Sequence, residues 1–231
     1  MAQPTRRPSP AAVTRDAKGC RIRAMILVGQ YDSPFVRRVA ISLRTLGFGY
    51  EHDTRSVFAD FDAMRDVNPL GRIPSLVLDG GEVLIDSAAI LDWLDQAVGP
   101  ERALIPAAGA ERRRALRLIA LATGAIDKIG AATYERIVRP SAFRWPEWID
   151  RCLTQGTGAI AALAAEPWPP DARLDQAQIT TACMIRYVRL ADPDLLPPGR
   201  HPTLDALSER CEALPAFQAN WPADYALPRN S

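Results

Sequence analysis

The spacing of apolar residues changes character near residue 100, and this change restricts the possible folds more than any other feature. From Met25 to Val98, short apolar runs alternate with segments of helical spacing. From Glu111 onward, strand signals largely disappear and apolar residues recur at helical spacing. The 231-residue chain is long enough for two parts. We therefore expect an α/β part followed by an all-helical part.

The first part opens with a strand–helix–strand pattern. Met25–Gly29 is a short apolar run that is typical of a buried strand. Ser33 and Pro34 form a cap-and-proline start for a helix that Gly47 ends, and residues 49–55 resemble a second strand. A unit of this size predicts two parallel strands joined by a right-handed crossover.

A short helix, a hairpin and a longer helix are predicted next. A weak helical pattern covers residues 58–67, and residues 75–79 and 82–85 flank a glycine-rich turn. Ser87 is the expected N-cap of a helix that continues to about Val98. The order βαβ, short helix, ββ, α describes a small α/β sandwich over residues 25–99.

The rest of the chain predicts a linker at residues 100–110 and an all-α domain at 111–231. Asp175 and Gln178 form a capping-box-like pair at the start of one of its helices. The expected helices cover residues 111–138, 146–165, 175–190, 202–214 and 216–221.

Residues 1–24 form a different segment, rich in Pro and Arg, with Asp16 as its single acid. No apolar period is present, so we expect a disordered extension. An Arg-rich, acid-poor start fits a transit peptide, or a chain whose real start is Met25. Both interpretations remain open.

Composition excludes several classes of protein. The formal net charge of +1 argues against a nucleic-acid or polybasic membrane binder. No apolar run approaches the ~18 residues of a transmembrane helix. The four cysteines form no CxxC motif and lie far in sequence from both histidines, so we expect reduced thiols in a cytoplasmic protein and no metal site. These cysteines are Cys20, Cys152, Cys183 and Cys211.

Three short motifs carry candidate chemistry, each with a purely structural alternative. Ser33 at a helix N-terminus favours an anion such as a ligand thiolate, or is only a helix cap. A cis Ile73–Pro74 bond would expose backbone groups that pair with an extended peptide, whereas a trans proline would only start a strand. Asp86 and Ser87 suit a ligand with an ammonium and a carboxylate, or are capping residues.

Together the motifs resemble the cytosolic glutathione transferases, from Met25 to about Trp221. The matching stretches are SPFVRRV at 33–39, NPLGRIP at 68–74, IDSAAILDWLD at 85–95 and LPAF at 214–217. The resemblance implies a thioredoxin-like N-terminal domain, an all-α C-terminal domain and a cytoplasmic homodimer. It further implies glutathione as co-substrate, a small hydrophobic electrophile as second substrate, a role in detoxification and no metal.

The resemblance also assigns site residues. Ser33 matches the catalytic Ser of the Ser-type classes, with a Ser-Pro-Phe motif like those of the tau, zeta and omega classes, and Tyr31 is the alternative thiolate donor. The glutathione-binding residues implied are Phe35, Arg72, Ile73, Pro74, Asp86 and Ser87. Ile73 would hold the cysteinyl part of glutathione, Asp86 and Ser87 the γ-glutamyl end, and Arg72 would lie near the glycyl carboxylate.

Several functions fit this resemblance. Glutathione conjugation to a hydrophobic electrophile is the leading hypothesis. The alternatives are glutathione-dependent isomerisation, peroxide or disulfide reduction, and a non-enzymatic interaction protein. We expect the electrophile site between the domains, with candidates Phe35, Lys128, Tyr134, Arg139, Trp145 and Trp148. The family's Ser/Thr-x-x-Asp helix cap is replaced here by Asp175 and Gln178, a departure that should affect stability and not chemistry.

Overall fold

The computed structural model describes residues 14–15, 21–22 and 25–222. Strands and helices are interleaved up to α3, and helices alone follow in the described part of the chain. The elements are β1 (Thr14–Arg15), β2 (Arg21–Ile22), β3 (Met25–Val28), α1 (Pro34–Leu46), β4 (Tyr50–Asp53), α2 (Phe61–Val67), β5 (Ser75–Val77), β6 (Val83–Leu84), α3 (Ser87–Val98), α4 (Gly109–Ile137), the 3-10 helix η1 (Ser141–Phe143), α5 (Pro146–Ala164), α6 (Gln176–Ala191), α7 (Pro202–Glu212) and α8 (Pro215–Gln218).

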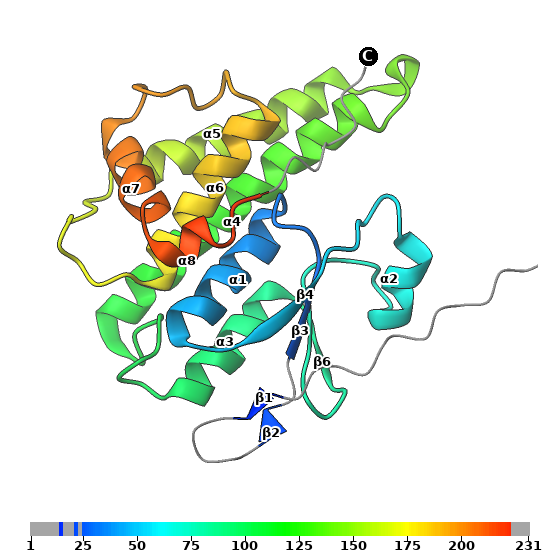
Figure 1. Ribbon diagram of the computed structural model, residues 1–231. Helices are drawn as coiled ribbons and strands as arrows, with labels where there is room; N and C mark the ends of the chain where they lie inside the picture. The colour runs from blue at the N-terminus through cyan, green and yellow to red at the C-terminus, as the bar shows by residue number, and fades with distance from the viewer. Residues whose placement is uncertain (1–13, 16–20, 23–24, 223–231) are drawn as a thin grey trace, which may run out of the picture.

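A four-stranded sheet in the order β4-β3-β5-β6 organises the N-terminal part. Strands β3 and β4 are parallel, with Met25 opposite Tyr50, while β5 and β6 run antiparallel to their neighbours. Helices α1 and α3 lie together on one side of the sheet, and α2 lies on the other (Figure 1). This thioredoxin-like arrangement confirms the predicted fold class.

The sequence of α1 sets both of its ends. Ser33 is the N-cap, and its hydroxyl oxygen accepts a hydrogen bond from the Val36 N–H at 3.4 Å. Gly47 ends the helix at a φ of +84°, in the left-handed region that glycine adopts at low cost. The helix therefore starts and stops where the sequence predicts, and Ser33 lies beyond the carboxyl end of β3.

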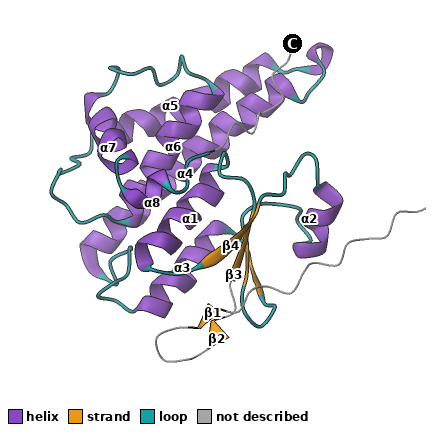
Figure 2. Ribbon diagram, viewed as in Figure 1, coloured by secondary structure: helices purple, strands orange, loops and turns teal. Residues whose placement is uncertain are grey.

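Helices alone form the C-terminal part, in which α4 and α5 lie side by side as a long pair and α6 packs against α4 (Figure 2). Helix α6 also packs against α1, so the two parts share a buried interface. At the start of α6, a carboxylate oxygen of Asp175 accepts a hydrogen bond from the Gln178 N–H at 2.8 Å. This cap agrees with the predicted capping-box-like pair.

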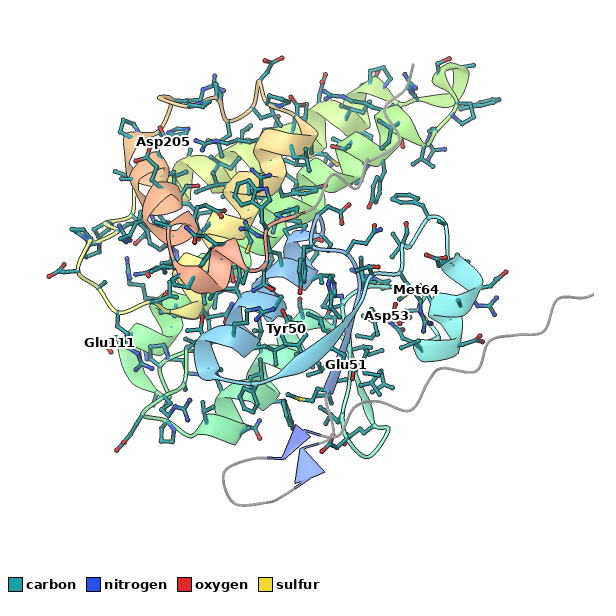
Figure 3. The ribbon with its side chains drawn as sticks, viewed as in Figure 1. Tyr50, Glu51, Asp53, Met64, Glu111 and Asp205 are labelled. Atoms are coloured by element: carbon teal, nitrogen blue, oxygen red, sulfur yellow. The ribbon has the colours of Figure 1, made fainter. Side chains whose placement is uncertain are left out.

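An ion pair ties the end of the described chain to the N-terminal part. The buried guanidinium of Arg37 donates to both carboxylate oxygens of Glu212, at 2.7 and 2.6 Å, and to the Asn220 carbonyl at 3.0 Å. The Asn220 side chain in turn accepts a hydrogen bond from the hydroxyl of Tyr50, which Figure 3 labels on β4. The segment after α8 is thus held against α1 and β4.

The structure differs from the sequence prediction at several points. Strand β4 is shorter than the predicted range 49–55, and α2 begins at Phe61 instead of residue 58. The N-cap of α3 is Asp86 and not Ser87, because the Asp86 carboxylate accepts the Ala88 N–H at 2.9 Å and Ser87 takes the first helical position. The expected disorder of residues 1–24 lies outside the described residues, except that β1 and β2 pair antiparallel.

Within residues 14–15, 21–22 and 25–222, no helix combines the length and the apolar character that crossing a membrane requires.

Candidate functional site

A cavity of about 400 Å³ lies between the two parts of the chain. The start of α1 contributes Ser33 and Phe35 to its lining, and Ile73 comes from the loop before β5. Helices α4 and α6 contribute Tyr134 and Tyr187 from the opposite side. The cavity therefore brings a helix N-terminus, exposed backbone and aromatic side chains to one place.

Ser33 lies in this cavity with its hydroxyl proton available. The oxygen caps α1 by accepting the Val36 N–H. A hydroxyl group has two acceptor lone pairs and one donor hydrogen, so capping leaves that hydrogen for a ligand. The N-terminus of α1 adds a partial positive charge. Capping and ligand binding are thus compatible roles for the same side chain.

The Ile73–Pro74 peptide bond is cis, which is one of the two alternatives that the sequence left open. Within the described ranges, neither the N–H nor the carbonyl of Ile73 forms a backbone hydrogen bond. The Asn68 side chain holds this loop by donating to the Arg72 carbonyl at 2.8 Å and the Ser75 hydroxyl at 3.1 Å. The backbone of Ile73 is therefore available to an extended ligand.

Gly29 lets this loop approach the end of β3. A Cβ built at Gly29 would lie 2.8 Å from the Cβ of Ile73 and 2.7 Å from a methyl group of Val36. Gly29 also has a φ of +126°, which L side chains rarely adopt. A larger residue at this position would push Ile73 away from α1.

A second cavity of about 180 Å³ extends the site toward α3. It shares Phe35, Arg72 and Ile73 with the first cavity and reaches Asp86 and Ser87 at the N-terminus of α3. Pro74 also lines it. The structure thus brings together, along one elongated site, Ser33 and all six residues that the sequence assigns to glutathione binding.

Arg38 lies behind the α3 end of this site, 3% exposed, and donates two hydrogen bonds to the hydroxyl oxygen of Ser87. Its Nη1 has no hydrogen-bond partner in the described part of the chain. Burial lowers the pKa of Arg38 to about 10, so the buried cation carries a solvation cost that a nearby anion would offset.

Tyr31, the alternative thiolate donor, lies outside the cavity lining. Its ring is buried and stacks on His52 with centroids 3.9 Å apart, and its hydroxyl contacts that of Tyr50 at 2.9 Å. Burial first, and then the Tyr50 hydroxyl, raises the pKa of Tyr31 above its ordinary value. Geometry therefore favours Ser33 as the residue that faces a ligand.

Comparison with known proteins identifies the family. The profile for "Glutathione S-transferase, N-terminal domain" matches residues 27–102. A glutathione transferase family member from Pseudomonas fluorescens Pf-5, whose crystal structure contains bound glutathione, is 34% identical, with a TM-score of 0.76 over 87% of this chain and 100% of that one. The chain belongs to the glutathione transferase family.

Other relatives agree with this assignment to the glutathione transferases. A glutathione S-transferase from Methylobacterium radiotolerans, in complex with glutathione sulfonate, is 27% identical, with a TM-score of 0.81 over 90% of this chain and 100% of that one. A probable maleylacetoacetate isomerase of Vibrio cholerae is 30% identical over 216 residues, which cover 84% of this chain and 94% of the relative. The family therefore includes relatives named for isomerisation as well as for transfer.

Within this member of the glutathione transferase family, the structure divides the expected electrophile candidates into two groups. Phe35 and Tyr134 line the cavity beside Ser33. The other candidates do not line that cavity. Lys128 lies on α4, Arg139 and Trp145 lie in the connection between α4 and α5, and Trp148 lies on α5. Arg139, Trp145 and Trp148 line a separate pocket of about 370 Å³, and Lys128 lies over the Trp148 ring at 5.7 Å.

Sequence reasoning missed several residues of the site. Asp32, Asp127 and Tyr187 line the main cavity, and Arg38 lies behind Ser87. Burial raises the pKa of both carboxyl groups, Asp32 and Asp127. Gly130 was the available signal for Tyr187, because a glycine inside a long helical pattern often marks a packing or functional position.

Over residues 14–15, 21–22 and 25–222, no three His, Cys, Asp or Glu side chains gather in an arrangement that could hold a metal ion.

Proposed function

We propose that this chain is a glutathione-dependent enzyme that holds the glutathione thiol as a thiolate with the hydroxyl of Ser33. One observation carries the proposal. The Ser33 oxygen caps α1 while the side chain lines the cavity, so its hydrogen is free to donate to a sulfur. The thiolate would then attack a hydrophobic electrophile in the same cavity, which is glutathione transfer.

The remaining site residues suit the other groups of glutathione. The backbone of Ile73, beside the cis Pro74, would pair with the cysteinyl unit. Ser87 and the N-terminus of α3 would take the γ-glutamyl carboxylate, and Asp86 the ammonium group.

Arg72 and Phe35 complete the proposed glutathione site. Arg72 lines both cavities and would lie near the glycyl carboxylate, and Phe35 lines the junction between them. The buried cation of Arg38 provides an independent indication that an anion belongs at the α3 end.

The interactions available at Ser33 are large enough for this role. A free thiol with a pKa of about 8.5 is only about 3% thiolate at pH 7. Lowering the pKa to about 6.5 requires about 2.7 kcal/mol. A hydrogen bond from Ser33 to the charged sulfur would supply about 1.5–3 kcal/mol, and the helix terminus about 0.3–1 kcal/mol. The site therefore requires no additional base to form the thiolate.

Isomerisation is the second candidate reaction. The relatives named as isomerases include the Vibrio cholerae protein and a maleylpyruvate isomerase of a Ralstonia species, which is 28% identical over 213 residues. Addition of a thiolate to a conjugated double bond followed by its release would isomerise the bond. Both reactions use the same activated thiol, and the second substrate decides between them.

Reduction through a protein thiol is disfavoured by the cysteines that the structure describes. Cys152, Cys183 and Cys211 are all buried, and none of them lines the cavity beside Ser33. Burial raises the pKa of Cys183 and of Cys211 to about 12, which suppresses their thiolates. A mixed-disulfide route would need an exposed thiol of low pKa.

A non-enzymatic role would not require this thiol site. The joint presence of Ser33, Ile73 with Pro74, and Asp86 with Ser87 supports an enzyme. The proposal also includes a cytoplasmic homodimer, as the family resemblance implies. Light scattering on the purified protein tests the dimer, since a monomer mass would contradict it.

A titration of the bound thiol tests the proposed role of Ser33. The ultraviolet absorbance of the glutathione thiolate is followed against pH in the wild type and in Ser33→Ala. We expect Ser33→Ala to bind glutathione and to raise the bound thiol pKa by about 1–2 units. Asp175→Ala is the control, because it removes a helix-cap side chain away from the cavity. An unchanged pKa in Ser33→Ala would contradict the role of Ser33.

A further inference from the structure

We propose that a third cavity, at the end of the N-terminal part away from Ser33, binds a small organic cation, an ammonium group carried on an aromatic or aliphatic body. The cavity has a volume of about 430 Å³. That volume falls within the range of small-molecule pockets, about 300–1,000 Å³. The position of the cavity, its half-buried aromatic rings and its two carboxylates carry the inference, which does not depend on the proposed function.

This cavity lies at the opposite end of β3 from Ser33. Met25, the first residue of β3, lines it, whereas Ser33 follows the carboxyl end of that strand. The connection after α1 contributes Phe48, the connection between β5 and β6 contributes Leu78, and α3 contributes Trp93. None of the described lining residues lines either cavity of the proposed glutathione site. A ligand in this cavity would therefore bind independently of glutathione.

Two aromatic rings form the apolar wall of this cavity. Phe48 and Trp93 are half-buried, and their ring centroids lie 6.0 Å apart at an interplanar angle of 43°. Both rings pack against a buried hydrophobic core, as Met25 and Leu78 do. The core thus holds the rings in place, while each ring keeps part of its surface accessible. The negative face of an aromatic ring attracts a cation, and this attraction is strongest for Trp.

The charges on the lining have one sign. Among the lining residues that the structure describes, only Asp79 and Glu82 are charged, and both are exposed. Neither carboxylate forms an ion pair with a cation in the described part of the chain. A ligand anion would meet two carboxylates here, whereas an ammonium group would meet both carboxylates and the ring faces. The lining therefore selects a cation.

Glycines keep the entrance of this cavity open. Gly47, Gly49 and Gly80 all line it. A Cβ built at any of the three would meet no described atom within 4 Å. Open space therefore lies beside each of these positions, and a ligand can reach the rings without displacing a helix or a strand.

Three ligands with one apolar body test the selection for a cation. They are para-tert-butylbenzylamine, para-tert-butylbenzyl alcohol and para-tert-butylbenzoate, which carry an ammonium, a hydroxyl and a carboxylate group at pH 7. By calorimetric titration of the full chain, we expect saturable binding of the amine, with a Kd at least about tenfold below that of the alcohol. The benzoate should show no saturable binding. Equal affinity for the amine and the alcohol, or no binding of the amine, would overturn the proposal.

Variants of the lining locate the bound amine. The double variant Asp79→Asn with Glu82→Gln should raise the amine Kd about tenfold and leave the alcohol Kd within about twofold of wild type. Trp93→Leu should raise both Kd values, because the ring also contacts the apolar body. The matched control is Asp62→Asn with Asp66→Asn, which removes two exposed carboxylates from α2, on the other side of the sheet, and should change neither Kd. A wild-type amine Kd in the variant of Asp79 and Glu82 would overturn the site.

Two further titrations separate this cavity from other places where the amine could bind. The amine Kd should stay the same in saturating glutathione and at every protein concentration. Displacement of the amine by glutathione would place it in the proposed glutathione site and overturn a separate one. An amine Kd that rises with protein concentration would show that a second copy of the chain covers the cavity, which would also overturn the proposal.

Discussion

Arg38 donates two hydrogen bonds to the hydroxyl oxygen of Ser87, from Nε at 3.2 Å and from Nη2 at 2.6 Å. These bonds occupy both acceptor sites of the hydroxyl, so its hydrogen can only donate outward. A free serine hydroxyl can donate or accept, but Ser87 can only donate toward the smaller cavity. The buried cation of Arg38 lies next to it. Arg38 is therefore a positioning residue for Ser87.

Ser87→Ala should weaken both the fold and the proposed glutathione site. The variant leaves two more buried N–H groups of Arg38 without an acceptor, so the free energy of unfolding should fall by about 1–3 kcal/mol. Glutathione Kd should rise about tenfold, because the hydroxyl donor to the carboxylate is lost. Urea unfolding and calorimetric titration measure the two effects. An unchanged Kd in a destabilised Ser87→Ala would show that Ser87 is only structural.

Asp86→Asn should separate capping from ligand binding. Asn caps a helix about as well as Asp, so the free energy of unfolding should stay within about 0.5 kcal/mol of wild type. The carboxylate proposed to hold the ammonium group is lost, and glutathione Kd should rise about tenfold. Asp86→Ala is the comparison, because it also removes the acceptor of the hydrogen bond from the Ala88 N–H. Its free energy of unfolding should fall by about 0.5–2 kcal/mol. Wild-type affinity in Asp86→Asn would limit Asp86 to capping.

Glu212→Gln should destabilise the protein without changing the bound thiol. The substitution leaves the Arg37 guanidinium buried without its carboxylate, which costs about 3–5 kcal/mol for fully buried pairs. Glu212 is 18% exposed, so we expect about 3 kcal/mol by urea unfolding. The bound thiol pKa should match wild type, because Glu212 does not line either cavity of the site. A wild-type free energy of unfolding in Glu212→Gln would show that the ion pair between Arg37 and Glu212 contributes nothing to stability.

Asp32→Asn should stabilise the protein at neutral pH. Burial raises the pKa of Asp32, so the folded state binds this proton more tightly than the unfolded chain does. Its contribution to stability is therefore complete below the unfolded carboxyl pKa of about 3.9 and is lost as pH rises from there through the higher pKa of the folded state. The free energy of unfolding of Asp32→Asn, measured by urea unfolding, should exceed that of wild type at pH 7. The difference between the two proteins should become smaller near pH 4. Asp150→Asn, an exposed carboxyl on α5, should show no such pattern.

The local sequence determined most of the elements, because their signals depend only on near neighbours. Helix α1 begins after Ser33, which caps it, with Pro34 at its first position, where a fixed φ suits a helix. It ends at Gly47, which adopts the left-handed conformation. The structure has both ends where the sequence predicts them. The prediction was wrong at α3, where Asp86 and Ser87 are both good caps and the sequence analysis chose Ser87. The structure ranks them because Arg38 occupies the Ser87 oxygen and leaves Asp86 to cap the helix.

The sequence by itself determined the chemistry available at the site. Three short motifs carry that chemistry, and it is their order along the chain that makes them resemble one family. They contain Ser33, Ile73 with Pro74, and Asp86 with Ser87. Only the tertiary structure decided which distant residues complete the site. Tyr187 reaches it because α6 packs against α4 at Gly130, a contact between residues that no local pattern links. Local propensity therefore defines the residues of the proposed thiol site, and the packing of helices defines which other side chains line the same cavity.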